Sequence, residues 1–118
     1  MSNLEVKPDL SNLVERELRN LCITGKYHGL SYLVSAIQQV VITPAKVKKL
    51  TTELYPEIAS EFYTSPSGVE HAIRTAIQAC WDRGGRKTLD KMIGRHLIER
   101  PTNCEFIDQI SSYIRRRY

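Results

Sequence analysis

Residues 55–81 restrict the fold of this chain more than any other stretch. An α-helix turns about 100° per residue, so apolar residues spaced three and four apart lie on one side of it. The second half of the stretch contains a run of such residues: Val69, Ala72, Ile73, Ala76, Ile77 and Cys80. This spacing predicts a helix over residues 67–81 whose apolar stripe packs in a core.

The other side of this predicted helix is polar. Five side chains that form hydrogen bonds lie there, and we call them the polar ridge: Ser67, Glu70, His71, Arg74 and Gln78. Burying so many polar groups without partners would cost free energy. We therefore expect the polar ridge to face outward.

A shorter helix is predicted before it, over residues 56–62, with Ile58, Ala59 and Phe62 on its inner side. A residue as small as Ala59 lets two helices cross closely. Two helices that meet at a steep angle through a tight turn form a helix-turn-helix. We expect this motif over residues 55–81.

The turn between the two helices, at residues 63–66, offers two ways to start the second helix. Either Ser65 caps it with Pro66 at the first helical position, or Ser67 caps it while Glu70, three residues on, closes a capping box. Both alternatives begin a helix at this point of the chain.

Helical spacing recurs through the remainder of the chain. The apolar residues that show it lie within residues 10–22, 30–41, 47–54, 89–93 and 106–114. Asp9 or Ser11 can cap the first of these helices, and Gly25 is placed to end it. Thr102 or Asn103 can cap the last.

Two breaks divide the middle and the end of the chain. Pro44 ends one helix and can open a short one, while Gly84 and Gly85 predict a loop before a helix at residues 88–95. No run alternates between apolar and polar residues as a half-buried strand requires. The predicted fold class is therefore all-α.

A length of 118 residues, 42% of them apolar, fits a single core. We expect a short polar leader at residues 1–9 and one helical domain at residues 10–118. No stretch of about 18 apolar residues is present, and residues 1–8 are polar. We therefore expect no membrane span and no signal peptide, and predict a cytoplasmic protein. The three cysteines lie on or beside apolar stripes and are predicted to be buried, reduced thiols: Cys22, Cys80 and Cys104.

The chain carries 17 Lys and Arg against 13 Asp and Glu, which gives a net charge of +4. This mild excess favours a polyanion as partner, although ordinary domains are often as basic. His28, His71 and His96 show no ligand spacing with the cysteines, and no glycine-rich loop follows a strand. We therefore predict no catalytic residue, no bound metal and no cofactor.

Several separated motifs resemble those of one known family. In chain order they are GLSYL at residues 29–33, AI at 36–37, YPEIA at 55–59, SGVEHAIRTAIQ at 67–78, WDRG at 81–84 and PTNCEFI at 101–107. From residue 13 onward the chain resembles the C-terminal DNA-binding domain of the stage-zero sporulation protein A family of response regulators.

The resemblance implies a compact six-helix effector domain that binds a short promoter box in double-stranded DNA. Such a domain activates or represses genes at the onset of sporulation, and it associates with the nucleoid when bound. The helix at residues 67–81 would enter the major groove and read bases through the polar ridge. Lys26, His28 and Ser65 are then the candidate phosphate contacts.

Two further partners follow from the same resemblance. Family members use the segment after the recognition helix, here at residues 82–94, to approach the sigma subunit of RNA polymerase. Arg83, Arg86 and Lys87 are the candidate contacts in this segment. Two copies of the domain would also pair head to tail on adjacent boxes.

Each base-reading candidate has a plainer alternative. The Arg74 guanidinium matches the O6 and N7 acceptors of guanine, or it contacts only phosphate or water. Glu70 accepts from a cytosine amino group, or it closes the capping box on Ser67. His71 donates to a base or a phosphate, or it is a solvated surface residue.

The chain departs from the family at three places. His71 stands where typical members have Arg, and Gly68 stands where a basic residue is common. The phosphoacceptor receiver domain that usually comes first does not fit before residue 10, so the chain is either an excised domain or a stand-alone relative. The substitutions at Gly68 and His71 keep one alternative open, a helical module that retains the fold but binds a protein instead of DNA.

Overall fold

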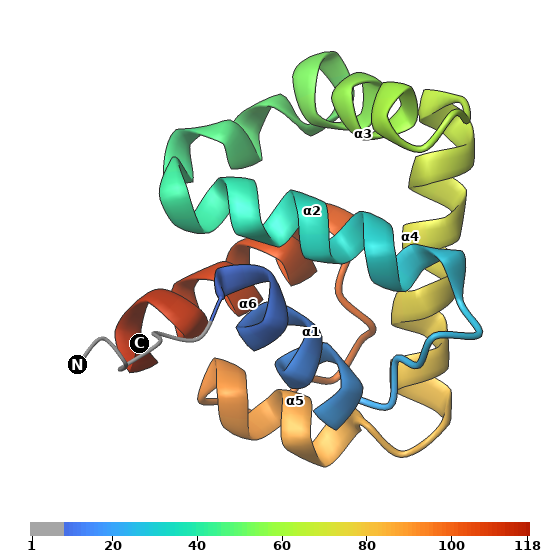
Figure 1. Cartoon of the computed structure of the whole chain (residues 1–118). Helices are drawn as coiled ribbons and strands as arrows, with labels where there is room; N and C mark the ends of the chain where they lie inside the picture. The colour runs from blue at the N-terminus through green and yellow to red at the C-terminus, as the bar shows by residue number, and fades with distance from the viewer. Residues whose placement is uncertain (1–8) are drawn as a thin grey trace, which may run out of the picture.

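The structure, a computed structural model, describes residues 9–118. These residues fold into six α-helices and two short helical segments, without a strand, so the prediction of an all-α domain with a helix-turn-helix is confirmed (Figure 1). In chain order the elements are α1 (Leu10–Asn20), α2 (His28–Ile42), η1 (Pro44–Lys49), η2 (Leu50–Leu54), α3 (Tyr55–Glu61), α4 (Pro66–Asp82), α5 (Arg86–Ile93) and α6 (Asn103–Arg117).

Helix α2 lies across the centre of the domain and contacts α1, α4 and α6 (Figure 1). Its buried side chains recur at helical spacing: Leu30, Leu33, Ala36, Ile37 and Val40. They meet the apolar stripe of α4 and the inner face of α6, where Phe106, Ile107 and Ile110 are fully buried. The core therefore forms around α2, and α4 packs along one edge of it.

The crossing of α2 and α4 is closest at Gly29. A Cβ atom at this position would lie 2.3 Å from the backbone oxygen of Ala72 and 2.8 Å from the Cβ of Ala76. Only a glycine leaves room for this approach. The crossing holds the N-terminal end of α2, and the loop before it, against the side of α4.

The first helix ends earlier than predicted. Asp9 caps α1, its carboxylate accepting from the Ser11 N–H at 3.1 Å, but the helix stops at Asn20 and not at Gly25. The reason is Cys22, whose φ of 66° turns the chain out of the helix. Residues 1–8 of the predicted leader lie outside the described residues.

The short helix expected after Pro44 is also different. The chain forms a 3₁₀ segment, η1, and then a π-helical turn, η2, that runs directly into α3. Leu50 and Leu54 are buried. Phe62 was predicted on the inner side of α3 but is 37% exposed, because α3 ends at Glu61. The Phe62 ring meets the Tyr32 ring edge-on, and the two ring centroids are 5.2 Å apart.

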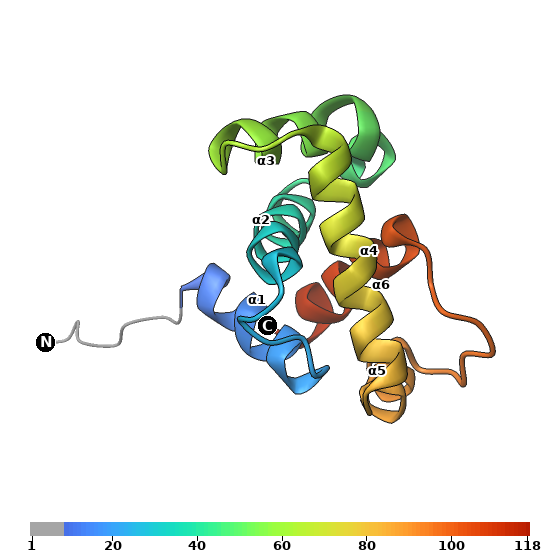
Figure 2. The same cartoon turned by 90° about the vertical axis from the view of Figure 1, so that its right-hand side faces the viewer.

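The C-terminal third is held by local caps. Helix α5 begins at Arg86, before the predicted residue 88, and ends at Ile93, where Gly94 takes a φ of 90°. Residues 94–102 then loop out beside α4 (Figure 2). Thr102 and Glu105 form a capping box at the start of α6, which selects Thr102 from the two predicted caps.

Asp90 ties the outlying loop to α5. One carboxylate oxygen accepts from the Leu97 N–H at 3.0 Å, and the other lies 2.9 Å from Nδ1 of His96. The bond from Leu97 and the contact with His96 hold the pKa of Asp90 below its ordinary value. All three cysteines are free thiols, as predicted, but only Cys80 is buried. Burial raises the pKa of Cys80 to about 12. The prediction of burial was wrong for Cys104, which is exposed, and for Cys22, which is half-buried.

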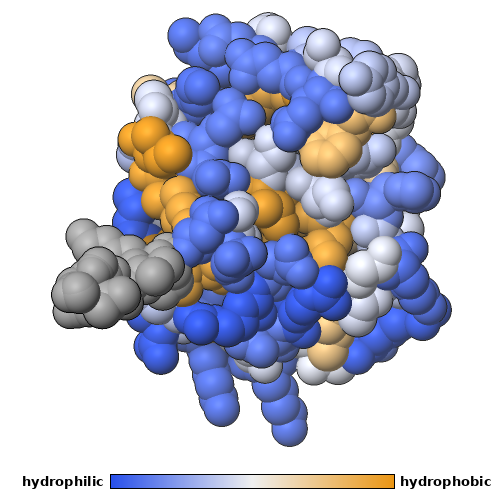
Figure 3. Space-filling model, in the orientation of Figure 1, coloured by the Kyte–Doolittle hydropathy of each residue, from blue (hydrophilic) through white to orange (hydrophobic). Residues whose placement is uncertain are grey.

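The surface is largely polar. Figure 3 shows the face seen in Figure 1 as mostly hydrophilic, with apolar residues in small separate areas. Among the helices of residues 9–118, none has both the length and the apolar character needed to cross a membrane.

Candidate nucleic-acid interface

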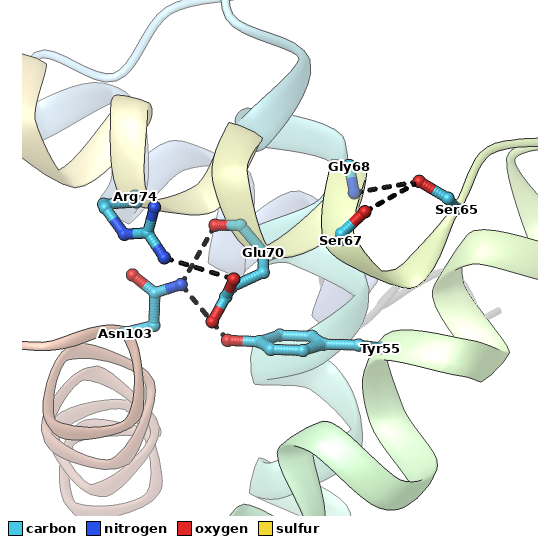
Figure 4. Close-up of polar contacts among 7 residues, drawn as sticks. All are labelled: Tyr55, Ser65, Ser67, Gly68, Glu70, Arg74 and Asn103. Carbon is cyan, nitrogen blue, oxygen red and sulfur yellow. Dashed lines mark hydrogen bonds and ion pairs between the residues drawn. The ribbon is translucent and has the colours of Figure 1, made fainter.

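The N-terminal end of α4 is fixed by Ser65. Its hydroxyl accepts from the Gly68 N–H at 3.0 Å and lies 3.3 Å from the Ser67 hydroxyl (Figure 4). The structure therefore adopts the Ser65 cap, and the alternative capping box of Ser67 and Glu70 is wrong. A Cβ on Gly68 would lie 2.9 Å from the Thr64 hydroxyl and 3.1 Å from the Ser65 hydroxyl. A glycine here leaves space for the cap.

The polar ridge lies on the outer face of α4. Ser67, Glu70, His71 and Arg74 are exposed, while Gln78 is half-buried and donates to a carboxylate oxygen of Asp82 at 2.6 Å. The structure adds Thr75, which is exposed on the same side of the helix. Helical spacing places Thr75 at the margin of the ridge, so the sequence carried the signal for it.

Glu70 and Arg74 form an ion pair one turn apart. A guanidinium nitrogen of Arg74 lies 3.1 Å from the Glu70 carboxylate, and about half of each side chain is exposed, 49% and 48%. Exposed pairs of this kind contribute only about 0.2–1 kcal/mol. Arg74 can therefore exchange Glu70 for another acceptor at small cost.

Asn103 connects three helices beside this ion pair. Its Nδ2 donates to the Tyr55 hydroxyl at 3.1 Å and to the Glu70 backbone oxygen at 3.1 Å (Figure 4). These bonds join the start of α6 to α3 and α4. Burial raises the pKa of Tyr55, outweighing the hydrogen bond from Asn103, so its phenol stays neutral. Asn103 was predicted only as a possible cap, since nothing local indicates partners 33 and 48 residues away.

The phosphate candidates lie near α4. Lys26 and His28 are exposed. They come just before Gly29, which packs on Ala72 in the middle of α4, so this part of the chain lies beside α4. The Lys26 ammonium is 5.3 Å from the centroid of the Tyr27 ring. Ser65 lies at the N-terminal end of α4, where its hydroxyl already serves the cap.

The candidate polymerase contacts lie at the opposite end of α4. Arg83, Arg86 and Lys87 are exposed around the turn into α5. The Arg86 guanidinium stacks on Trp81, 3.8 Å from the ring centroid, and this stacking limits its movement. Since α4 has 17 residues, this cluster and the Ser65 cap are about 25 Å apart along the helix.

The chain matches a known protein family. The family model described as Sporulation initiation factor Spo0A C terminal matches residues 14–114. The matched region runs from the first turns of α1 almost to the end of α6, and it includes the whole helix-turn-helix.

Proposed function

Because the chain belongs to the Spo0A C-terminal family, a family of DNA-binding transcription regulators, we propose that it reads a short promoter box with the polar ridge of α4. One observation supports this proposal above others, the exposure of four ridge side chains on a single outer face. An α-helix with its side chains is about 10–12 Å across, and the major groove is about 12 Å wide. The outer face of α4 suits this groove.

Arg74 is the proposed reader of guanine, because its two parallel N–H groups match the O6 and N7 acceptors. Glu70 is not required by the cap, so its carboxylate is available to orient Arg74 or to accept from a cytosine amino group. His71 donates one hydrogen bond where an arginine would donate two, which would change the preferred box. Ser67 and Gln78 complete the base-reading set at the two ends of the ridge.

The remaining contacts belong to the same proposal. Lys26, His28 and Ser65 would bind phosphates and set the position of α4, since phosphate contacts carry no sequence information. The Arg83, Arg86 and Lys87 cluster would contact the sigma subunit of RNA polymerase, and two copies would pair head to tail on adjacent boxes. The protein would then act in the bacterial cytoplasm, associated with the nucleoid.

Arg74→Ala tests the base-reading role. Losing a bidentate contact to guanine costs about 1–3 kcal/mol of discrimination, so binding to the preferred box should weaken far more than binding to a random duplex. Lys91→Ala removes the same charge from an exposed position on α5 and serves as the control. Equal losses on both duplexes would reduce Arg74 to a phosphate contact.

Salt dependence separates DNA binding from the alternative of a protein-binding module. Phosphate contacts release counterions, so affinity for DNA should fall steeply between about 50 and 200 mM salt. A complex that is insensitive to salt would favour a protein partner.

A further inference from the structure

A groove runs along the side of α4 that carries Glu70 and Arg74. It has a volume of about 530 Å³ and lies between α4, the η1–η2 segment and the start of α6. Its charged lining residues are three cations and one carboxylate: Lys48, Arg74, Arg100 and Glu70. Since Glu70 already pairs with Arg74, the excess positive charge comes from Lys48 and Arg100.

These two cations are available to a ligand. Lys48 and Arg100 are exposed, and the ion pairs formed within residues 9–118 include neither of them. Lys48 comes from η1, and Arg100 comes from the loop of residues 94–102 that passes beside α4 (Figure 2). Two segments far apart in the chain therefore bring cations to one groove.

The neutral lining of the groove also suits an anion. Thr51 and Thr52 contribute hydroxyl groups, and the Tyr55 hydroxyl accepts from Asn103, which leaves its own proton for another acceptor. Hydroxyl donors beside unpaired cations are typical of sites that bind phosphate oxygens.

The position of the groove identifies which phosphates it can reach. A helix in the major groove has one DNA strand on each of its two sides, because helix and groove have nearly the same width. Gly29, which follows Lys26 and His28 in the chain, packs on one side of α4 against Ala72, and the groove lies on the other side, next to Arg74. We propose that this groove binds the sugar–phosphate backbone of the second strand through Lys48 and Arg100. This inference rests on the proposed function, since it requires α4 to enter the major groove.

The proposal predicts a loss of affinity without a loss of specificity. Each phosphate contact changes the slope of log affinity against log salt concentration by about −0.9. One contact therefore strengthens binding roughly eightfold at 0.1 M salt relative to its effect at 1 M salt. At 0.1 M salt, the affinity of the double variant Lys48→Ala/Arg100→Ala should therefore fall roughly eightfold per lost contact, both for the preferred box and for a random duplex. Its salt slope should be shallower by about 0.9 per contact.

A matched control removes two charges at the far end of α6. Arg116 and Arg117 are exposed near its C-terminus, and a helix of 15 residues places them about 20 Å from its start. Fluorescence anisotropy with labelled duplexes measures the DNA affinity of the parent, the double variant and the control Arg116→Ala/Arg117→Ala. The measurement is repeated over a series of salt concentrations. Because Lys48 and Arg100 are exposed, the double variant should unfold at the temperature of the parent.

The outcomes separate this inference from the proposed function. Unchanged affinity and salt slope in the double variant would overturn the groove as a phosphate site, while base preference in the parent would leave the proposed function intact. A loss confined to the preferred box, or an equal loss in the Arg116 and Arg117 control, would also overturn it. A parent that binds no duplex would remove the proposed function and this inference together.

Discussion

The close crossing of α2 and α4 makes Gly29→Ala a sharp test of the packing that positions the interface. The added methyl would lie 2.3 Å from the Ala72 backbone oxygen, 2.9 Å from the Ala72 carbonyl carbon and 2.8 Å from the Ala76 Cβ, against 3.4 Å or more for an ordinary contact. Two of these three atoms belong to the backbone of a helix and cannot rotate away. The two helices must therefore separate by about 1 Å or distort.

The size of the effect follows from two opposing terms. Overpacking a well-packed site costs about 1–3 kcal/mol, whereas replacing glycine by alanine inside a helix gains at most about 1 kcal/mol. Gly29 is the second residue of α2, where that gain is smaller. We expect a net loss of about 2 kcal/mol, which lowers the unfolding temperature by roughly 6–12 °C in a domain of this size.

Thermal unfolding followed by circular dichroism measures this loss. Gly25→Ala is the matched control, because a Cβ there would meet only the Arg19 Nη2 atom at 3.5 Å, an ordinary contact. The Gly25 variant should melt like the parent and the Gly29 variant well below it. Equal melting of the two variants would refute the close crossing, and with it the placement of Lys26 and His28 beside α4.

Two further predictions concern local bonds. Ser65→Ala removes the α4 cap and should lower the free energy of unfolding in urea by about 1 kcal/mol. Ser67→Ala should change it by less than about 0.5 kcal/mol. A larger loss for Ser67→Ala than for Ser65→Ala would identify Ser67 as the cap. The pKa of Asp90 is lowered by the Leu97 N–H and by His96, so its stabilising effect is present above the ordinary aspartate pKa and is lost as pH falls through the lower folded value. Asp90→Asn should therefore weaken the fall in melting temperature on acidification, and an unchanged fall would contradict this role.

The starts of α1 and α6 were predictable because their signals are local. Asp9 precedes the first apolar repeat, and Thr102 stands three residues before Glu105, so spacing alone indicates both caps. Helix ends were less predictable. Nothing in the sequence shows that Cys22 takes a positive φ and ends α1 early, and helical spacing does not distinguish the π-helical turn of η2 from an α-helix.

The candidate interface also combines features that have a local sequence signal with features that have none. The exposure of the polar ridge follows from periodicity within one helix, and so does the pairing of Glu70 with Arg74 four residues apart. The bonds of Asn103 and the groove that holds Arg100 depend on how distant segments approach one another in space. A single sequence carries no local pattern for such contacts.

Selection of bound duplexes from a random pool, followed by sequencing, tests the central claim that the outer face of α4 reads bases. The parent should enrich a short box with a conserved guanine, and Arg74→Ala should lose the preference at that guanine while retaining it elsewhere. A pool without any enriched motif, or the same motif from both proteins, would contradict base reading by α4.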